Sequence, residues 1–228
     1  MPTQIDAWLD RHFPLPKRFQ AGSPPNIPDG HWLVWLGIEE KMHLHSVGSV
    51  PWHSLREHRE RTMKYVNNAI SILGSDQVEE EDDKKMVIEQ LGEPPEPARP
   101  LYVVTIKENG EESIVYIGKT TARNRFSRGH SVALKLLDPK FQRYEKLVYR
   151  LSATVLVGDD HVSLEWLDPL AVAEQILDDV ESLLIYDCKP ALNAQKKKRN
   201  LAKHQTSIHI QNLVEGLKRG SFLNDYII

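Results

Sequence analysis

Three features in the second half of the chain have the chemistry needed to act on a phosphate ester. Glu181 is a single carboxylate among apolar helix positions, and one carboxylate completed by phosphate oxygens and waters suits Mg²⁺. Arg125 carries a planar guanidinium that matches a phosphate group. The run Lys196–Arg199 adds four adjacent cations, which could contact backbone phosphates. Each feature also occurs on ordinary protein surfaces, so its meaning depends on the elements that position it.

The elements around these residues alternate between strand and helix. The sequence predicts, in order, a strand at 101–106, a return strand at 113–117, a helix at 123–137, a strand at 148–157 and a helix that starts at 168–169. Asn109-Gly110 lies between the first two strands and is a strong hairpin signal. The last helix must end before Lys189-Pro190, because a residue that precedes proline is disfavoured in helical conformation.

This order, with several residues at defined places in it, resembles the GIY-YIG nuclease superfamily. The resemblance covers roughly residues 100–195 and is carried by Tyr102, by the segment Tyr116-Ile117-Gly118-Lys119-Thr120, by Arg125 and His130, and by Glu181 twelve residues before Asn193. The first glycine of the family's motif is replaced by Pro100, so that only the tyrosine of this half-motif is present.

The resemblance implies an α+β fold with a small three-stranded antiparallel sheet flanked by helices, and a metal-dependent DNA endonuclease. The catalytic residues that it implies are Tyr102, Tyr116, Arg125, His130, Glu181 and Asn193. Glu181 would be the ligand of Mg²⁺ or of another divalent cation such as Mn²⁺. In relatives the first tyrosine is thought to activate or orient the attacking water, and the second lies near the phosphate. Asn193 would fix the loop beside Glu181 through side-chain bonds to the backbone.

Basic residues near this site are expected to bind nucleic acid. They are Lys119, Arg123, Arg128, Lys196, Lys197, Lys198 and Arg199. The charge distribution agrees with this expectation, since residues 1–98 hold 10 basic and 16 acidic side chains and residues 99–228 hold 19 and 16. A polyanion is therefore expected to bind mainly to the second part.

Four prolines within residues 94–100 mark a linker, because a helix cannot cross them. We therefore predict a mostly helical N-terminal region of unknown role over residues 1–98. The nuclease domain is predicted over residues 99–195, and a basic segment with a C-terminal helix over residues 196–228. The capping boxes Thr3/Asp6 and Ser54/Glu57 predict two helix starts in the N-terminal region.

The composition excludes several classes of protein. The chain has 228 residues, a formal net charge of -3 and 40% hydrophobic residues, which fits a globular protein and excludes collagen-like repeats. Its longest uncharged apolar run is far shorter than the roughly 20 residues that span a bilayer. Since the single Cys188 cannot form an internal disulfide, we expect a cytoplasmic location.

Three functional hypotheses remain open on the sequence alone. The first is a DNA endonuclease, such as a restriction or other defence enzyme, that acts on double-stranded DNA. It would work as a homodimer, since a double-strand cutter with one site per chain needs two chains. The second is a non-catalytic nucleic-acid-binding module on the same fold, although such a module has no need of the Glu181 carboxylate. The third is a secreted nuclease toxin.

Overall fold

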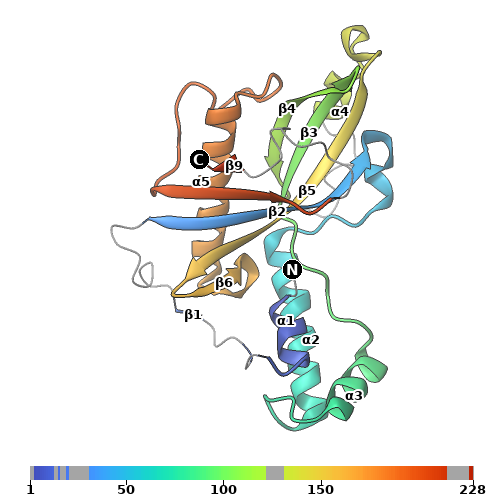
Figure 1. Cartoon of the computed structure of the whole chain (residues 1–228), viewed down its shortest axis with the longest axis vertical. Coiled ribbons are helices and arrows are strands. Elements are labelled where there is room, and N and C mark those ends of the chain that lie inside the picture. Colours follow the sequence, from blue (N-terminus) through green and yellow to red (C-terminus); the bar gives the residue numbers. More distant parts are fainter. Residues whose placement is uncertain are drawn as a thin grey trace.

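A seven-stranded mixed sheet is the centre of the molecule (Figure 1). The computed structural model describes residues 3–12, 15, 19–20, 31–121, 131–214 and 226–227. The strand order is β4-β3-β5-β2-β8-β9, with β6 paired to β5. The strands of this sheet are β2 (Trp32–His43), β3 (Leu101–Glu108), β4 (Glu111–Lys119), β5 (Glu145–Val157), β6 (Asp160–Ser163), β8 (Thr206–Asn212) and β9 (Tyr226–Ile227). All neighbours are antiparallel except β2 and β8.

The prediction of a small three-stranded sheet was therefore wrong, although the chain is α+β. Strands β4, β3 and β5 are the three that were expected, and β2 and β8 extend their sheet. A C-terminal helix was expected within residues 196–228, but residues 206–212 form the strand β8. In β8 the buried Ile208 and Ile210 alternate with the exposed His209, which is the period of a strand. Because β2 pairs with β5, part of residues 1–98 lies in the same sheet as the predicted nuclease domain.

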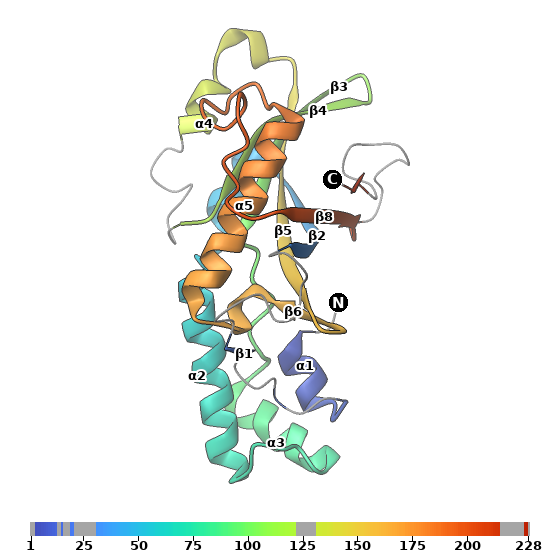
Figure 2. The same ribbon diagram turned by 90° about the vertical axis from the view of Figure 1, so that its left-hand side faces the viewer.

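Helices α1, α2 and α3 lie beyond one end of the sheet, and α5 lies against one of its faces (Figures 1 and 2). The helices are α1 (Gln4–Leu9), α2 (Leu55–Leu73), α3 (Glu81–Leu91), α4 (Ser131–Lys135) and α5 (Leu170–Cys188), with the 3-10 turns η2 (Leu44–Ser49), η3 (Pro139–Phe141) and η4 (Leu164–Trp166). The two-residue strands β1 (Phe19–Gln20) and β7 (Leu167–Asp168) pair separately. Both predicted capping boxes are present, at the starts of α1 and α2. Within the described ranges, no helix is long and apolar enough to cross a membrane.

The sheet is buried on both faces around β3, β4 and β5. The larger core lies beneath α5, which buries Ala173, Ile176, Val180 and Leu184. A smaller core on the opposite face contains Trp52, Tyr102, Val104, Val115, Val132, Leu136 and Val148. The two cores fix the hairpin of β3 and β4 from both sides, and this hairpin carries both candidate tyrosines. Its turn residues Asn109 and Gly110 both have positive φ, as a tight two-residue hairpin turn requires.

Candidate functional site

Several of the predicted site residues line one cavity of about 300 Å³ beside β4. The cavity is bounded by β4, α4, α5 and the loop that follows α5. Tyr116, Ser131, Lys135, Glu181, Leu192, Asn193 and Lys196 are among the residues that line it. Tyr116 and Glu181 are far apart in the sequence, and the fold brings them to the same space. The cavity is large enough for a phosphate group and several waters.

Glu181 is largely buried at the wall of this cavity. Its side chain is 14% exposed, and Oε2 accepts a hydrogen bond from Lys196 Nζ at 2.6 Å. Lys196 is the first residue of the basic run that was expected to contact phosphate, and it thus forms an ion pair with the candidate metal ligand Glu181. The pairing offsets the cost of holding a carboxylate away from water.

A second ion pair lies beside the first, between Lys119 at the end of β4 and Asp178 on α5. Burial lowers the pKa of Lys119, the negative charge of Glu181 raises it, and the positive charge of Lys196 lowers it again. The site therefore contains two lysines and two carboxylates that influence one another.

The two tyrosines lie on one face of the hairpin with their rings in contact. The ring centroids of Tyr102 and Tyr116 are 5.9 Å apart, and the ring planes are inclined by 32°. Tyr102 is fully buried behind Tyr116, which lines the cavity. Gly118 lies opposite Tyr102 in the register of β3 and β4. A Cβ at Gly118 would lie 2.7 Å from Tyr102 Oη and 2.7 Å from Tyr116 Cε1, so only glycine leaves room for both rings.

Asn193 fastens the loop after α5 to the outer edge of β4. Its Oδ1 accepts a hydrogen bond from Ile117 N at 2.9 Å, and its Nδ2 donates to Ile117 O at 2.9 Å. The neighbouring Leu192 N donates to Val115 O at 2.8 Å. These bonds satisfy backbone groups that an edge strand would otherwise leave open. The geometry gives Asn193 a positioning role beside Glu181.

The far end of the same loop is held by Asp179, to which the sequence analysis assigned no role. Its side chain is 1% exposed. Oδ1 accepts from Lys203 N at 2.8 Å, and Oδ2 lies 2.7 Å from His204 Nδ1. Position 179 falls on the apolar stripe of α5 between Ile176 and Val180, and a carboxylate on a buried stripe needs partners. That placement was the signal in the sequence, because it distinguishes Asp179 from Asp178, which lies off the stripe and is more exposed.

The remaining predicted residues divide into two groups. Arg123, Arg125, Arg128 and His130 lie outside the described residues. Lys198 and Arg199 are exposed on the loop, and Lys197 Nζ donates to Ala191 O at 3.3 Å. Across the described ranges, no group of three or more His, Cys, Asp or Glu side chains could hold a metal ion. A single carboxylate facing a wet cavity nevertheless fits Mg²⁺, which retains several waters and takes few protein ligands.

Searches against protein-family models, curated proteins and solved structures gave no match to this chain.

Proposed function

We propose that this protein is a metal-dependent DNA endonuclease of GIY-YIG type. The observation that carries the proposal is the convergence of Tyr116 and Glu181 on one cavity, with the ring of Tyr102 in contact behind Tyr116. A phenol and a carboxylate at one wet cavity are groups that phosphodiester hydrolysis uses, because it needs an oriented nucleophile and a means of neutralising phosphoryl oxygens.

Each residue of the cavity has a defined task in this proposal. Glu181 would hold Mg²⁺ or Mn²⁺, which when bound would neutralise phosphoryl charge and acidify a water. Tyr116 presents its side chain to the cavity and would hydrogen-bond a water or a phosphate oxygen there. Lys135 also lines the cavity and would attract the phosphodiester. Tyr102 and Gly118 set the position of the Tyr116 ring.

Lys196 has two alternative partners in this scheme. In the structure it neutralises Glu181. If Glu181 held a divalent cation and a DNA phosphate lay in the cavity, the ammonium group would turn to that phosphate without leaving the site. Its flexible four-carbon stem permits this change of partner.

The finer assignments follow from the same proposal. The substrate is double-stranded DNA, and two chains would cut the two strands as a homodimer. The biological role would be restriction or another form of defence, carried out in the cytoplasm.

One observation favours a second candidate function, a non-catalytic nucleic-acid-binding module. The Glu181–Lys196 ion pair neutralises the carboxylate that catalysis requires, and a purely structural carboxylate would be paired in the same way. The two functions differ in what the carboxylate contributes, since only the nuclease loses its activity when that charge is removed.

Plasmid cleavage with the Glu181→Gln variant separates these functions. The wild type should cleave supercoiled plasmid with Mg²⁺ and not with EDTA, and Glu181→Gln should bind DNA but fail to cleave it. Glu174→Gln is the matched control, because Glu174 lies on the same helix, has a side chain that is 44% exposed and pairs with Arg56. Full cleavage by Glu181→Gln, or none by the wild type with either metal, would reject the nuclease proposal.

A further inference from the structure

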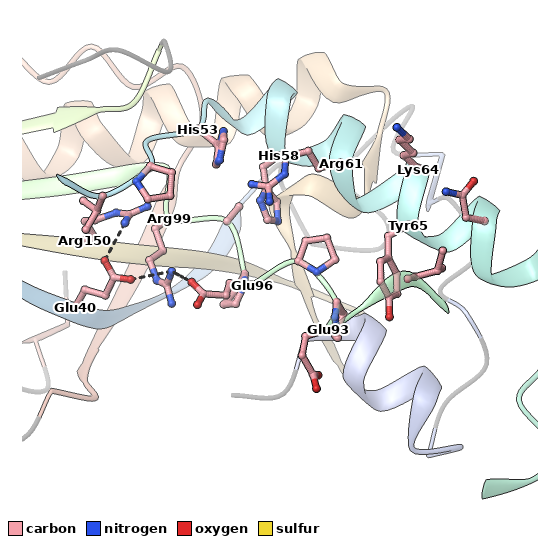
Figure 3. A pocket seen from close by; sticks show the side chains of 18 residues that line it. Glu40, His53, His58, Arg61, Lys64, Tyr65, Glu93, Glu96, Arg99 and Arg150 are labelled. Atoms are coloured by element: carbon pink, nitrogen blue, oxygen red, sulfur yellow. Dashed lines mark hydrogen bonds and ion pairs between the residues drawn. The ribbon is translucent and has the colours of Figure 1, made fainter. Parts of the chain in front are cut away.

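A groove of about 840 Å³ lies in the region whose role the sequence left open. It lies between α2 and the proline-containing segment 93–99, as Figure 3 shows. Arg61 and Lys64 line it from α2, Glu93 and Glu96 line it from the opposite segment, and Arg150 of β5 closes one end. The groove is therefore built by both parts of the chain.

A row of paired residues connects this groove to the tyrosine site. Across the sheet, Gly118 of β4 pairs with Tyr102 of β3, Tyr102 pairs with Arg150 of β5, and Arg150 pairs with Glu40 of β2. Neighbouring strands lie about 4.8 Å apart, so the three spacings from β4 across β3 and β5 to β2 add up to a distance of about 14 Å. Since duplex DNA rises about 3.4 Å per base pair, this distance equals about four base pairs.

Trp52 covers the middle of this row. Its ring contacts Tyr102 edge to face at a centroid distance of 5.5 Å, and the guanidinium of Arg150 lies 4.8 Å from its centroid. Trp52 Nε1 donates to Val47 O at 2.8 Å, which fixes the ring. Trp52, a residue of the N-terminal region, thus stands between Tyr102 and the groove.

The carboxylates at this end of the groove are already neutralised. Arg99 donates to Glu39 at 3.0 Å and pairs with Glu40 at 2.9 Å and with Glu96 at 2.6 Å. Arg150 Nη1 pairs with Glu40 at 2.9 Å. These pairs hold the pKa of Glu96 below its usual value, chiefly through its hydrogen bond with Arg99, so that it stays ionised and paired.

Some of the basic side chains that line the groove have unpaired donor groups among the described residues. Neither Arg61 nor Lys64 forms an ion pair within the described part of the chain, and both are exposed on successive turns of α2. Arg150 is 7% exposed, and its Nε has no hydrogen-bond partner among the described residues. Asn68 adds an amide further along the same helix face. Three carboxylates line the groove, and Glu93 is the one of them that forms no ion pair among the described residues.

We infer that this groove binds the phosphate backbone of the DNA duplex, and that its nearer end, at Arg150 and Glu40, lies about four base pairs from the tyrosine site. Arg61 and Lys64 would contact the phosphates, and the Arg99–Glu96 and Arg150–Glu40 pairs would shape the groove without repelling them. This inference rests on the proposed function, since the nuclease site defines where the duplex lies. It gives residues 1–98 a task, which is to hold the duplex beside the tyrosine site.

The test measures DNA binding rather than cleavage. A short fluorescent duplex is titrated without metal, and the affinity is followed between about 50 and 200 mM salt. Each phosphate contact contributes about 0.9 to the slope of log K against log salt, so Arg61→Gln/Lys64→Gln should lower the slope by about 1.8. The control is Arg56→Gln/Lys85→Gln, which removes two exposed cations of α2 and α3 that pair with Glu174 and Asp82. The control should keep the wild-type slope.

The outcomes separate this inference from the nuclease proposal. The wild type could bind DNA without cleaving it while Arg61→Gln/Lys64→Gln still lowers the slope of log K against log salt. That result would reject the nuclease proposal and support DNA binding by the groove. A wild type that cleaves, with the same slope in both double variants, would overturn the groove. Binding of thymidine monophosphate that depends on Arg61 and Lys64, with an unchanged DNA slope, would also overturn it in favour of a free nucleotide.

Discussion

Replacing Gly118 with alanine tests whether the packing of the two tyrosines sets the activity. The new Cβ would lie 2.7 Å from Tyr102 Oη, 2.7 Å from Tyr116 Cε1 and 2.8 Å from Tyr102 Cζ. Carbon atoms pack best at about 3.5–4.0 Å, so the rings must move by roughly 1 Å. Overpacking of this kind costs about 1–3 kcal/mol of folding free energy. A misplacement of about 1 Å at a reacting group costs on the order of 100-fold in rate.

Urea denaturation and plasmid cleavage measure the two effects of Gly118→Ala separately. Gly48→Ala is the control, because a Cβ there meets nothing within 4 Å. The double variant Gly118→Ala/Tyr102→Phe removes one of the closest atoms, so it should recover part of the lost stability. If Gly118→Ala has the same free energy of unfolding as the wild type and cleaves plasmid at the same rate, the two rings do not lie over the Gly118 backbone and the proposed geometry is wrong.

Three further predictions concern the cavity and its loop. Tyr102→Phe and Tyr116→Phe should each reduce cleavage while the free energy of unfolding changes by no more than about 1.5 kcal/mol; a larger loss of stability with normal cleavage would make both hydroxyls structural. Asn193→Ala leaves the Ile117 N–H and C=O without their partner, so urea denaturation should show a loss of about 2 kcal/mol or more. Lys196→Gln should bind Mn²⁺ more tightly than the wild type, because the ammonium group that competes for Glu181 is gone, and it should cleave more slowly, because the proposed phosphate contact is gone too. Lys197→Gln is the control. An unchanged affinity of Lys196→Gln for Mn²⁺ would contradict the proposed exchange of Lys196 between Glu181 and a phosphate.

Local patterns in the sequence predicted the parts of the fold that depend on neighbours in the chain. The Asn109-Gly110 hairpin, the capping box at Ser54 and the long apolar stripe of α5 all appear in the structure. Each is determined within a few residues by turn chemistry, capping or helical period. Tyr116 and Glu181 line the same cavity, and nothing local to either residue indicates the other; the sequence linked them only through the resemblance to a nuclease family.

Long-range pairing was not predictable in the same way. The apolar run at 32–36 is long enough only for a short strand. The partners of β2 are β5 and β8, about a hundred residues away or more, so no local period shows that β2 extends to His43. In the segment 206–217 the apolar residues fit both a strand and a helix, and the parallel partner β2 decides for the strand. The Glu181–Lys196 pair depends on how the loop after α5 turns back, which the run of four cations does not indicate.

The position of Lys196 is set by the backbone rather than by attraction between two surface charges. The loop is fixed before it by Asn193 on β4 and after it by Asp179, which binds residues 203 and 204. Between these anchors Lys196 itself has φ of 67°, a left-handed conformation that costs a non-glycine residue roughly 1–2 kcal/mol. Such strain persists only where surrounding contacts impose it, and it concentrates at functional sites. Because the anchors do not involve the lysine side chain, the proposed exchange of Glu181 for a phosphate would leave the loop in place. The same anchors hold Lys197, Lys198 and Arg199 on the loop that follows Lys196, where the proposed duplex would meet them.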